Sequence, residues 1–455
     1  MTYPQAISYL GSLINYERFS GWAYRESFRL ERFRDFLHSI GDPQAGLKCV
    51  HVAGSKGKGS TCAFISYVLR RLGYNVGLYT SPHLSDFRER IRILGVRCQV
   101  SGVRQGGDFE GMIPRKDLAR LVTGLKPAID KFHRAKKHEP LSFFEVYTAL
   151  AFIYFKEKKV DFAVLETGLG GRLDATNTVD PLVCVITPIS YEHTQQLGNT
   201  LKAIAGEKAG IIKSKRSIVI SAEQKEEVAR VIRERCKHTG ARLYRVGKDT
   251  KYKENRNGSF TVRGIKAGYS GLRIRLLGPH QMANASAAIA AVEALGFYGS
   301  KAAGSIRQGL YETVWPGRCE VILRRPTIVL DGAQNSASAG VLKKAIRENF
   351  SAAGGSASGG KYKKLILVLG ISSDKDIKGI CRQFRGFVDR VILTKADNPR
   401  AIDPEKLAGN FCGKEIFITK NVKEAGRLAL MLAGQEDLIV VTGSLFVVGE
   451  FRDER

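Results

Sequence analysis

The chain contains the stretch HVAGSKGKGS at residues 51–60, between an apolar run at 47–52 that predicts a strand and an apolar run at 61–72 that predicts a helix. A glycine-rich turn in this position is typical of a nucleotide phosphate site, because backbone N–H groups can approach a polyphosphate closely. Lys58 would reach the outer phosphates, and the Ser60 hydroxyl would join a magnesium shell. A turn that only connects strand and helix is the simpler alternative.

Composition predicts a two-domain globular protein. The chain has 455 residues, of which 44% are hydrophobic and 25% charged, a length that suits two domains of ordinary size. No apolar run approaches the roughly 20 residues that a membrane span needs, and residues 1–29 do not resemble a secretory signal. We therefore expect a cytoplasmic protein without a membrane partner. The eight cysteines lack the spacing of a zinc site or a disulfide framework.

The chain is strongly basic, with a formal net charge of +28. Residues 320–455 hold 22 Lys and Arg against 16 Asp and Glu, so most of the surplus belongs to the part that contains the glycine-rich turn. This distribution suits polyanionic small molecules such as ATP and a multiply carboxylated substrate. Nucleic-acid binding and a general basic bias of the source organism are alternatives. The dispersed charges and the lack of a nucleic-acid module argue against nucleic acid as a partner.

Two series of strand-like runs indicate two α/β domains. The first series lies at 76–80, 160–166, 182–187 and 217–221, and the second at 327–331, 364–370, 390–394, 415–419 and 437–443. Between them, the Pro-Gly pair in WPGR at 315–318 breaks regular structure. We predict a domain at 1–315 with a parallel sheet like that of P-loop ATPases, and a Rossmann-like domain at 316–455. The two would face each other across a cleft.

Two segments predict loops. The run SAAGGSASGG at 351–360 is too poor in apolar residues to order itself, so we expect a flexible surface loop. The basic stretch 97–115 is either a mobile loop beside the first cleft or an insertion without function.

Three further residues carry possible chemistry. Glu166 ends a predicted strand, and ligands of α/β sheets bind at that edge, so it is a candidate magnesium ligand or else a solvated acid that caps a turn. His193 would reach the same edge, although imidazole is an uncommon magnesium ligand. Lys208 lies in a helical segment, 201–213, with small apolar neighbours. On its own it predicts a surface or ion-paired lysine.

Several motifs follow one another in a characteristic order. They are SPHL at 81–84, GPHQMANA at 278–285, WPGR at 315–318, DGAQN at 331–335 and TGSL at 442–445. With the phosphate loop and the three residues above, they closely resemble the folylpolyglutamate synthase/dihydrofolate synthase family of the Mur ligase superfamily. The resemblance runs from about residue 47 to the C-terminus, and the extra Gly59 between lysine and hydroxyl is typical of that superfamily.

The resemblance implies an ATP-dependent ligase of folate biosynthesis and one-carbon metabolism. Such an enzyme joins L-glutamate to dihydropteroate or to a reduced folate, including folylpolyglutamates, while ATP becomes ADP and phosphate. A carboxylate is too poor an electrophile for direct attack by an amine, so in this superfamily ATP first converts it to an acyl phosphate. We expect a bifunctional, monomeric enzyme. A monofunctional folylpolyglutamate synthase is an alternative.

The resemblance also implies roles for individual residues. The ATP phosphates would bind Gly54, Ser55, Lys56, Gly57, Lys58, Gly59 and Ser60, with further ATP contacts from Asn284, Arg318 and Asp331. Magnesium would be held by Ser60, Glu166 and His193. Lys208 matches a lysine that is carbamylated in the superfamily, where it supports a second cation. The expected catalytic residues are Lys58, Lys208 and His193.

The substrate-binding residues implied by the resemblance are Ser81, Pro82, His83, Arg400 and Ser444. The run FRERI at 87–91 continues the family pattern beside the first three. Arg400, in DNPR at 397–400, would pair with a carboxylate of glutamate, and an exposed turn is the alternative.

Three residues depart from the commonest family pattern. Lys56 replaces a frequent asparagine, Glu192 an aspartate and Gln334 a histidine, and the last change bears on the nucleotide contact. A Mur ligase acting on a peptidoglycan precursor is a further alternative, but the roughly 50 residues before the phosphate loop leave no room for its usual N-terminal domain. A nonenzymatic nucleotide-binding protein would not need Glu166, His193 and Lys208.

Overall fold

The computed structural model describes residues 1–17, 29–95, 109–135, 137–350 and 362–454. The predicted flexible loop at 351–360 and most of the stretch 97–115 lie outside these ranges, so both remain expectations. Within the described ranges, every helix is either too short or too polar to cross a membrane.

A seven-stranded sheet forms the core of the N-terminal part, in the order β3-β2-β4-β1-β5-β6-β7. Only β2 and β3 pair antiparallel. The strands are β1 Cys49–Ala53, β2 Val76–Tyr79, β3 Ile91–Leu94, β4 Phe162–Glu166, β5 Val183–Ile186, β6 Ile218–Ser221 and β7 Arg242–Arg245. The four strands predicted in the first series are confirmed, each shorter than its apolar run. This parallel sheet is the fold class that the sequence predicts.

Helices cover both faces of this sheet, which explains why its central strands β4, β1 and β5 are buried throughout and mostly apolar. The helices are α1 Tyr3–Ser12, α3 Leu30–Ser39, α4 Lys58–Arg71, α5 Arg115–Arg134, α6 Phe143–Glu157, α7 Thr194–Leu197, α8 Leu201–Ala209, α9 Glu226–Thr239, α10 His280–Ala294 and α11 Ser300–Glu312. Val50 and Val52 of β1 pack in the same core as α4 and α10, whereas Ala53 packs in the core that contains α8 and α9. Helix α4 follows β1 after a short turn and packs against α10 and α11.

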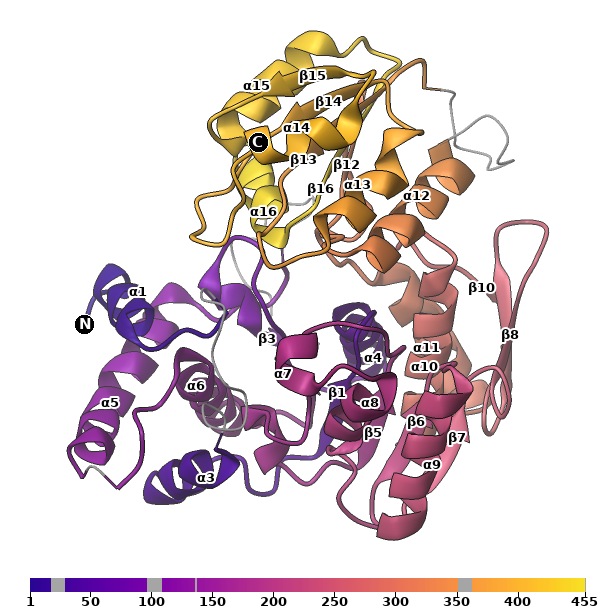
Figure 1. The fold of residues 1–455 in the computed structure, drawn as a ribbon. Coiled ribbons are helices and arrows are strands. Elements are labelled where there is room, and N and C mark those ends of the chain that lie inside the picture. The colour runs from indigo at the N-terminus through magenta and orange to yellow at the C-terminus, as the bar shows by residue number, and fades with distance from the viewer. Residues whose placement is uncertain (18–28, 96–108, 136, 351–361, 455) are drawn as a thin grey trace.

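A small antiparallel sheet follows β7, in the order β10-β9-β8. Its strands are β8 Lys251–Glu254, β9 Phe260–Arg263 and β10 Gly268–Leu272. Figure 1 shows it at the side of the N-terminal part, beside α11.

The C-terminal part is a six-stranded sheet in the order β11-β12-β16-β13-β14-β15. Its strands are β11 Glu320–Arg324, β12 Thr327–Leu330, β13 Leu365–Leu369, β14 Arg390–Leu393, β15 Glu415–Ile418 and β16 Leu438–Thr442. All five strands of the predicted second series are confirmed and run parallel. The antiparallel edge strand β11 was not predicted, because it is only half-buried and its apolar run is confined to residues 321–323.

Five helices pack on this sheet: α12 Ser336–Phe350, α13 Ile377–Arg385, α14 Glu405–Ala408, α15 Val422–Leu432 and α16 Leu445–Asp453. The connection from α11 to β11 contains the WPGR motif, and Figure 1 shows the C-terminal sheet stacked on one end of the N-terminal part. We propose the domain boundary at residue 316 within this connection. Trp315 is buried on the N-terminal side, where its ring meets Phe109 edge-on at 5.7 Å.

We predict opposite effects for two glycines of α11. A Cβ at Gly309 would lie 2.6 Å from the Cα of Val68 in α4, so Gly309→Ala should lower the free energy of unfolding by roughly 1–3 kcal/mol. A Cβ at Gly304 would meet nothing within 4 Å, so Gly304→Ala should raise it by about 0.5–1 kcal/mol. Urea denaturation of the two variants measures both. Equal effects would show that α4 and α11 are not in close contact.

Candidate functional site

The turn from β1 to α4 has no room for side chains at two positions. A Cβ at Gly54 would lie 1.9 Å from Thr187 Oγ1, and a Cβ at Gly57 would lie 2.5 Å from Asn284 Oδ1. Gly57 also has a φ of +77°, a conformation that glycine adopts without strain. The phosphate loop therefore threads between the end of β5 and helix α10, which brings the predicted ATP contact Asn284 directly against it.

The N–H groups of this loop divide into two sets. Those of Ser55 and Lys56 both donate to the Pro188 carbonyl, at 3.0 and 3.1 Å, and the Ser55 hydroxyl donates to Ser190 O at 3.1 Å. The first bond of the helix turn is from Thr61 N to Gly57 O. The N–H groups of residues 58–60 therefore have no partner within the helix, as at any helix N-terminus, where anions bind readily. Phosphate contact would fall to this second set, with Lys58 and Ser60 beside it.

Beneath the loop lies a buried ion pair. The Lys208 ammonium, whose side chain is 2% exposed, donates to Gly54 O at 2.7 Å and to Glu192 Oε1 at 2.9 Å. Lys56 approaches the same carboxylate at 4.0 Å. Burial lowers the pKa of Lys208 and brings the pKa of Lys56 to about 8. Glu192, one of the departures from the family pattern, is thus the shared counter-ion of two lysines.

Glu166 faces the loop from the end of β4, as the sequence predicts. Its side chain is nearly buried, one oxygen accepts a hydrogen bond from Ser81 N at 3.3 Å, and the other lies 4.0 Å from the Lys58 ammonium. Burial raises the pKa of Glu166, and the charge of Lys58 opposes that rise. Ser60, also buried, lies in the first turn of α4.

His193 differs from these groups in its backbone conformation and its solvent exposure. It is exposed, has a φ of +47°, and immediately precedes α7. Among the described residues, no three His, Cys, Asp or Glu side chains gather into a metal-ligating group. A magnesium ion at this edge fits Ser60 and Glu166 together with phosphate oxygens, because Mg²⁺ takes few protein ligands beside its substrate oxygens and waters. The role of His193 as a ligand remains a sequence-based prediction.

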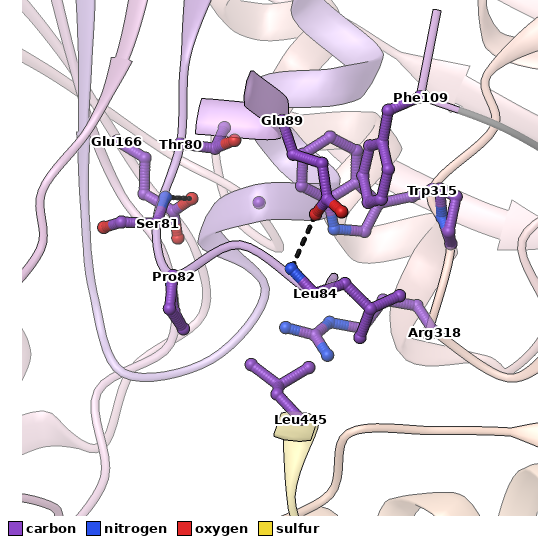
Figure 2. Close-up of a pocket in the computed structure, with 12 residues that line it drawn as sticks. Thr80, Ser81, Pro82, Leu84, Glu89, Phe109, Glu166, Trp315, Arg318 and Leu445 are labelled. Atoms are coloured by element: carbon purple, nitrogen blue, oxygen red, sulfur yellow. Dashed lines mark hydrogen bonds between the residues drawn. The ribbon is translucent and has the colours of Figure 1, made fainter. Parts of the chain in front are cut away.

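The loop that contains Ser81, Pro82 and His83 forms one wall of a cavity between the two sheets (Figure 2). His83 Nδ1 accepts a hydrogen bond from Arg90 Nε at 2.8 Å, and the His83 ring lies 4.4 Å from the Phe87 ring, centroid to centroid. The other residues of the cavity wall come from α4, the segment from the end of β2 to the helical turn Phe87–Arg90, the segment before α5, the end of β4, the linker and α16: Gly59, Thr80, Leu84, Glu89, Phe109, Glu166, Trp315, Pro316, Arg318 and Leu445. Glu89, Phe109 and Leu445 were not among the predicted site residues.

Arg318 and Asp331 meet at the base of the linker. Burial raises the pKa of the Asp331 carboxyl, the charge of Arg318 opposes that rise, and one carboxylate oxygen accepts from Cys319 N at 2.8 Å. A Cβ at Gly332 would lie 2.6 Å from Arg318 Nη1. Both predicted ATP contacts of this region therefore lie together, held by the backbone that enters the C-terminal sheet. Gln334, the third departure from the family pattern, donates its N–H to Ser338 at 3.2 Å.

Arg400 and Ser444 lie at the carboxyl edge of the C-terminal sheet, with different surroundings. Arg400 Nη1 lies 3.8 Å from Asp374, and its Nε is buried without a hydrogen-bond partner in the part of the chain that the structure describes. Asp374 also pairs with Lys375 at 2.9 Å, and the charge of Lys375 acts on Lys56. The Ser444 hydroxyl accepts from Phe446 N at 3.2 Å as the cap of α16.

Lys375 and Glu192 were missed as site residues, although each lies in the loop that follows a predicted strand. Charged residues just beyond the carboxyl end of a parallel strand are the signal that could have found them. Which of them face the cleft depends on the approach of the two sheets.

Comparison with known proteins agrees with this arrangement. Family models match the Mur ligase middle domain at residues 132–292 and the Mur ligase glutamate ligase domain at 317–445. The chain is 31% identical over 433 residues to the dihydrofolate synthase/folylpolyglutamate synthase of Bacillus subtilis (strain 168), a match that covers 93% of this chain and 94% of that protein.

Solved structures agree as well. Mycobacterium tuberculosis folylpolyglutamate synthase complexed with ADP has a TM-score of 0.85 at 28% identity, covering 99% of this chain and 97% of that one. E. coli FolC in complex with DHPP and ADP has a TM-score of 0.80 at 28% identity, covering 100% and 97%. A phosphate loop in the N-terminal domain, together with matches to the Mur ligase middle and glutamate ligase domains, defines an ATP-dependent ligase. The chain belongs to the folylpolyglutamate synthase/dihydrofolate synthase family of the Mur ligase superfamily.

The buried pair predicts a pH dependence of stability. Burial alone would raise the pKa of Glu192, but the charges of Lys208 and Lys58 outweigh it and lower that pKa to about 2. A depressed carboxyl pKa stabilises the fold above the unfolded pKa, so this contribution, on the order of 3 kcal/mol, is lost as the pH falls from about 5 to about 2. Urea denaturation at a series of pH values should show this loss in the wild type. Glu192→Gln should lack it, and parallel pH profiles would contradict the assignment.

Proposed function

We propose that this chain joins L-glutamate to the carboxylate of dihydropteroate and to reduced folates, including folylpolyglutamates, at the expense of ATP. The observation that carries the proposal is the phosphate loop with its lysines, which opens beside a cavity walled by the Ser81–Leu84 loop, the interdomain linker and α16. ATP on one side and an acceptor carboxylate on the other would meet near Glu166. This arrangement supports phosphoryl transfer to the carboxylate, followed by attack of the glutamate amine.

Lys58 and the N-terminus of α4 would provide most of the electrostatic stabilisation of the transferring phosphoryl group. Charge that develops on the transferring phosphoryl group would face the Lys58 ammonium and the unpaired N–H groups of residues 58–60. Ser60 and Glu166 would hold the magnesium ion, which supplies further charge neutralisation when bound. His193, exposed at the start of α7, could complete the ligand set only through a change in its surroundings.

Lys208 is proposed as a site of carbamylation. The reaction needs a neutral amine, whose nitrogen bonds to the carbon of CO₂ and releases a proton, and burial favours the neutral form of Lys208. The carbamate would carry a negative charge within reach of the Glu192 carboxylate, which is now its partner at 2.9 Å. Two anions so close in a buried site require a cation between them. Carbamylation and a second cation are therefore one proposal.

The C-terminal domain would supply the amino acid and complete the nucleotide site. Arg318 and Asp331 would contact ATP, and Arg400 would exchange Asp374 for a carboxylate of glutamate. Lys375 adds a positive charge close enough to act on the phosphate loop. Ser444 caps α16, so a substrate contact would come in addition to that structural role. A monomeric state and a cytoplasmic location complete the proposal as expectations from the sequence.

The test is phosphate release from Mg-ATP and L-glutamate, with dihydropteroate and tetrahydrofolate supplied separately. Product masses should rise by one glutamate residue. Turnover with both acceptors would establish a bifunctional enzyme, and turnover with tetrahydrofolate alone would establish a folylpolyglutamate synthase. If folded protein that binds ATP releases no phosphate with either acceptor, a folate substrate is contradicted and the Mur-type amino-acid ligase is favoured.

Glu166→Gln should lower kcat by about 10²–10³ and weaken the dependence on magnesium, because the neutral amide is a poor ligand for a hard cation. Glu157→Gln is the control. Glu157 pairs with Arg120 on the exposed end of α6, far along the sheet from the loop, and its variant should keep full activity. Steady-state kinetics at several magnesium concentrations distinguish the two. An unchanged kcat in Glu166→Gln would exclude Glu166 from the metal site.

Carbamylation of Lys208 predicts a carbamate signal in the ¹³C NMR spectrum of protein equilibrated with ¹³C-bicarbonate. Lys208→Ala should lose the signal together with activity, whereas Lys202→Ala, an exposed lysine of the same helix, should keep both. A wild-type spectrum without the signal, in active enzyme, would leave Lys208 with a structural ion pair only.

A further inference from the structure

Glu89 occupies an unusual position beside the substrate loop. It lies in the single helical turn Phe87–Arg90, directly after loop 82–86, and is 4% exposed. Its carboxylate accepts three backbone hydrogen bonds from consecutive residues of that loop: Leu84 N at 2.6 Å, Ser85 N at 2.9 Å and Asp86 N at 2.7 Å. Figure 2 shows the side chain over the cavity, with the bond to Leu84 drawn. A buried carboxylate here thus finds its partners in the loop itself.

Loop 82–86, whose backbone is hydrogen-bonded to Glu89, forms one wall of the cavity. Ser81 N donates to Glu166, and the Leu84 side chain lines the cavity. On its outer side the loop touches the C-terminal domain, since a Cβ at Gly449 of α16 would lie 2.1 Å from Leu84 O. A displacement of this backbone would move both the cavity wall and the surface against which α16 packs.

A second contact fixes the same loop from the side chain of the next residue. Arg90 is fully buried and donates from Nε to His83 Nδ1 at 2.8 Å, while its other nitrogens bond to Glu17. Because Nδ1 accepts this bond, the proton of a neutral His83 lies on Nε2. Consecutive residues therefore hold the backbone of the loop and the ring at its centre.

We propose that Glu89 is a positioning residue for the pteridine-bearing substrate, because its carboxylate sets the backbone of loop 82–86 and with it the cavity wall. This inference rests on the proposed function. It assigns Glu89 no contact with the reacting atoms. Its effect should therefore appear in the binding of the pteridine substrate and not in the binding of ATP, which the proposed function assigns to the phosphate loop.

The test is the variant Glu89→Gln. One amide oxygen cannot replace two carboxylate oxygens, and the amide NH₂ would face a loop N–H, so at least one of the three bonds is lost. We expect the KM for dihydropteroate or tetrahydrofolate to rise about tenfold, while the KM for ATP changes by less than about twofold. Glu89→Asp keeps the charge on a shorter side chain and should shift the same constant in the same direction by a smaller factor.

Glu293 offers a matched control. It is 2% exposed, and its carboxylate also accepts from three consecutive backbone N–H groups, those of Ile265, Lys266 and Ala267, in the turn between β9 and β10. The chemistry is the same, but the turn belongs to the small sheet, and neither Glu293 nor the residues of the turn line the cavity. Glu293→Gln should lower the melting temperature and leave all KM values within about twofold of the wild type.

The outcomes separate the inference from the function on which it rests. An unchanged KM for the pteridine substrate in both Glu89 variants, or an equal rise in the KM for ATP, would overturn the positioning role while wild-type turnover upheld the ligase. The same selective rise in Glu293→Gln would also overturn it, since any loss of stability would then suffice. Wild-type protein inactive with both pteridines would overturn the proposed function and the role of Glu89 together.

Discussion

The hydrogen bond from the Lys208 ammonium to the Gly54 carbonyl joins the phosphate loop to the core of the N-terminal domain. It exists because Gly54 and Gly57 let the chain pass where any side chain would collide with Thr187 or Asn284. The dipole of the Gly54 carbonyl stabilises the buried Lys208 ammonium, and the Glu192 carboxylate neutralises its charge. The direction of α4, and with it the position of Lys58 and Ser60, follows from this one crowded turn.

The electrostatics of the site reflect the same crowding. Lys56, Lys58 and Lys208 surround two carboxylates, Glu166 and Glu192, which leaves one positive charge in excess before the C-terminal domain contributes its own. Groups in such surroundings interact more strongly than they would in water. A polyphosphate that enters this site therefore meets uncompensated positive charge, and each buried carboxylate is available to a cation. The distribution of basic residues along the chain is consistent with this, although the site itself uses only a few of them.

The two domains meet through backbone as much as through side chains. Leu84 of the substrate loop packs against Gly449 of α16, and a Cβ at Gly317 of the linker would lie 3.3 Å from the Leu84 side chain. These close approaches rely on residues without a Cβ, as in the phosphate loop. The cavity lies between them, so its shape is a property of the interface between the two sheets and of the loop that Glu89 holds. The identity of the acceptor substrate would be decided at the same interface.

Local pattern was enough for the phosphate loop and for nine strands, because a buried parallel strand is a short apolar run between breaks and a glycine-rich turn is recognisable by itself. It was also enough to place Glu166, which is the last residue of its strand. It was not enough for β11, which is only partly buried and ends at an exposed residue. Nor could it pair Lys208 with Glu192 and Gly54, or find Glu89 and Lys375. The spacing of these residues in the sequence does not indicate that they are in contact. Only the packing of the sheets, helices and linker brings them together.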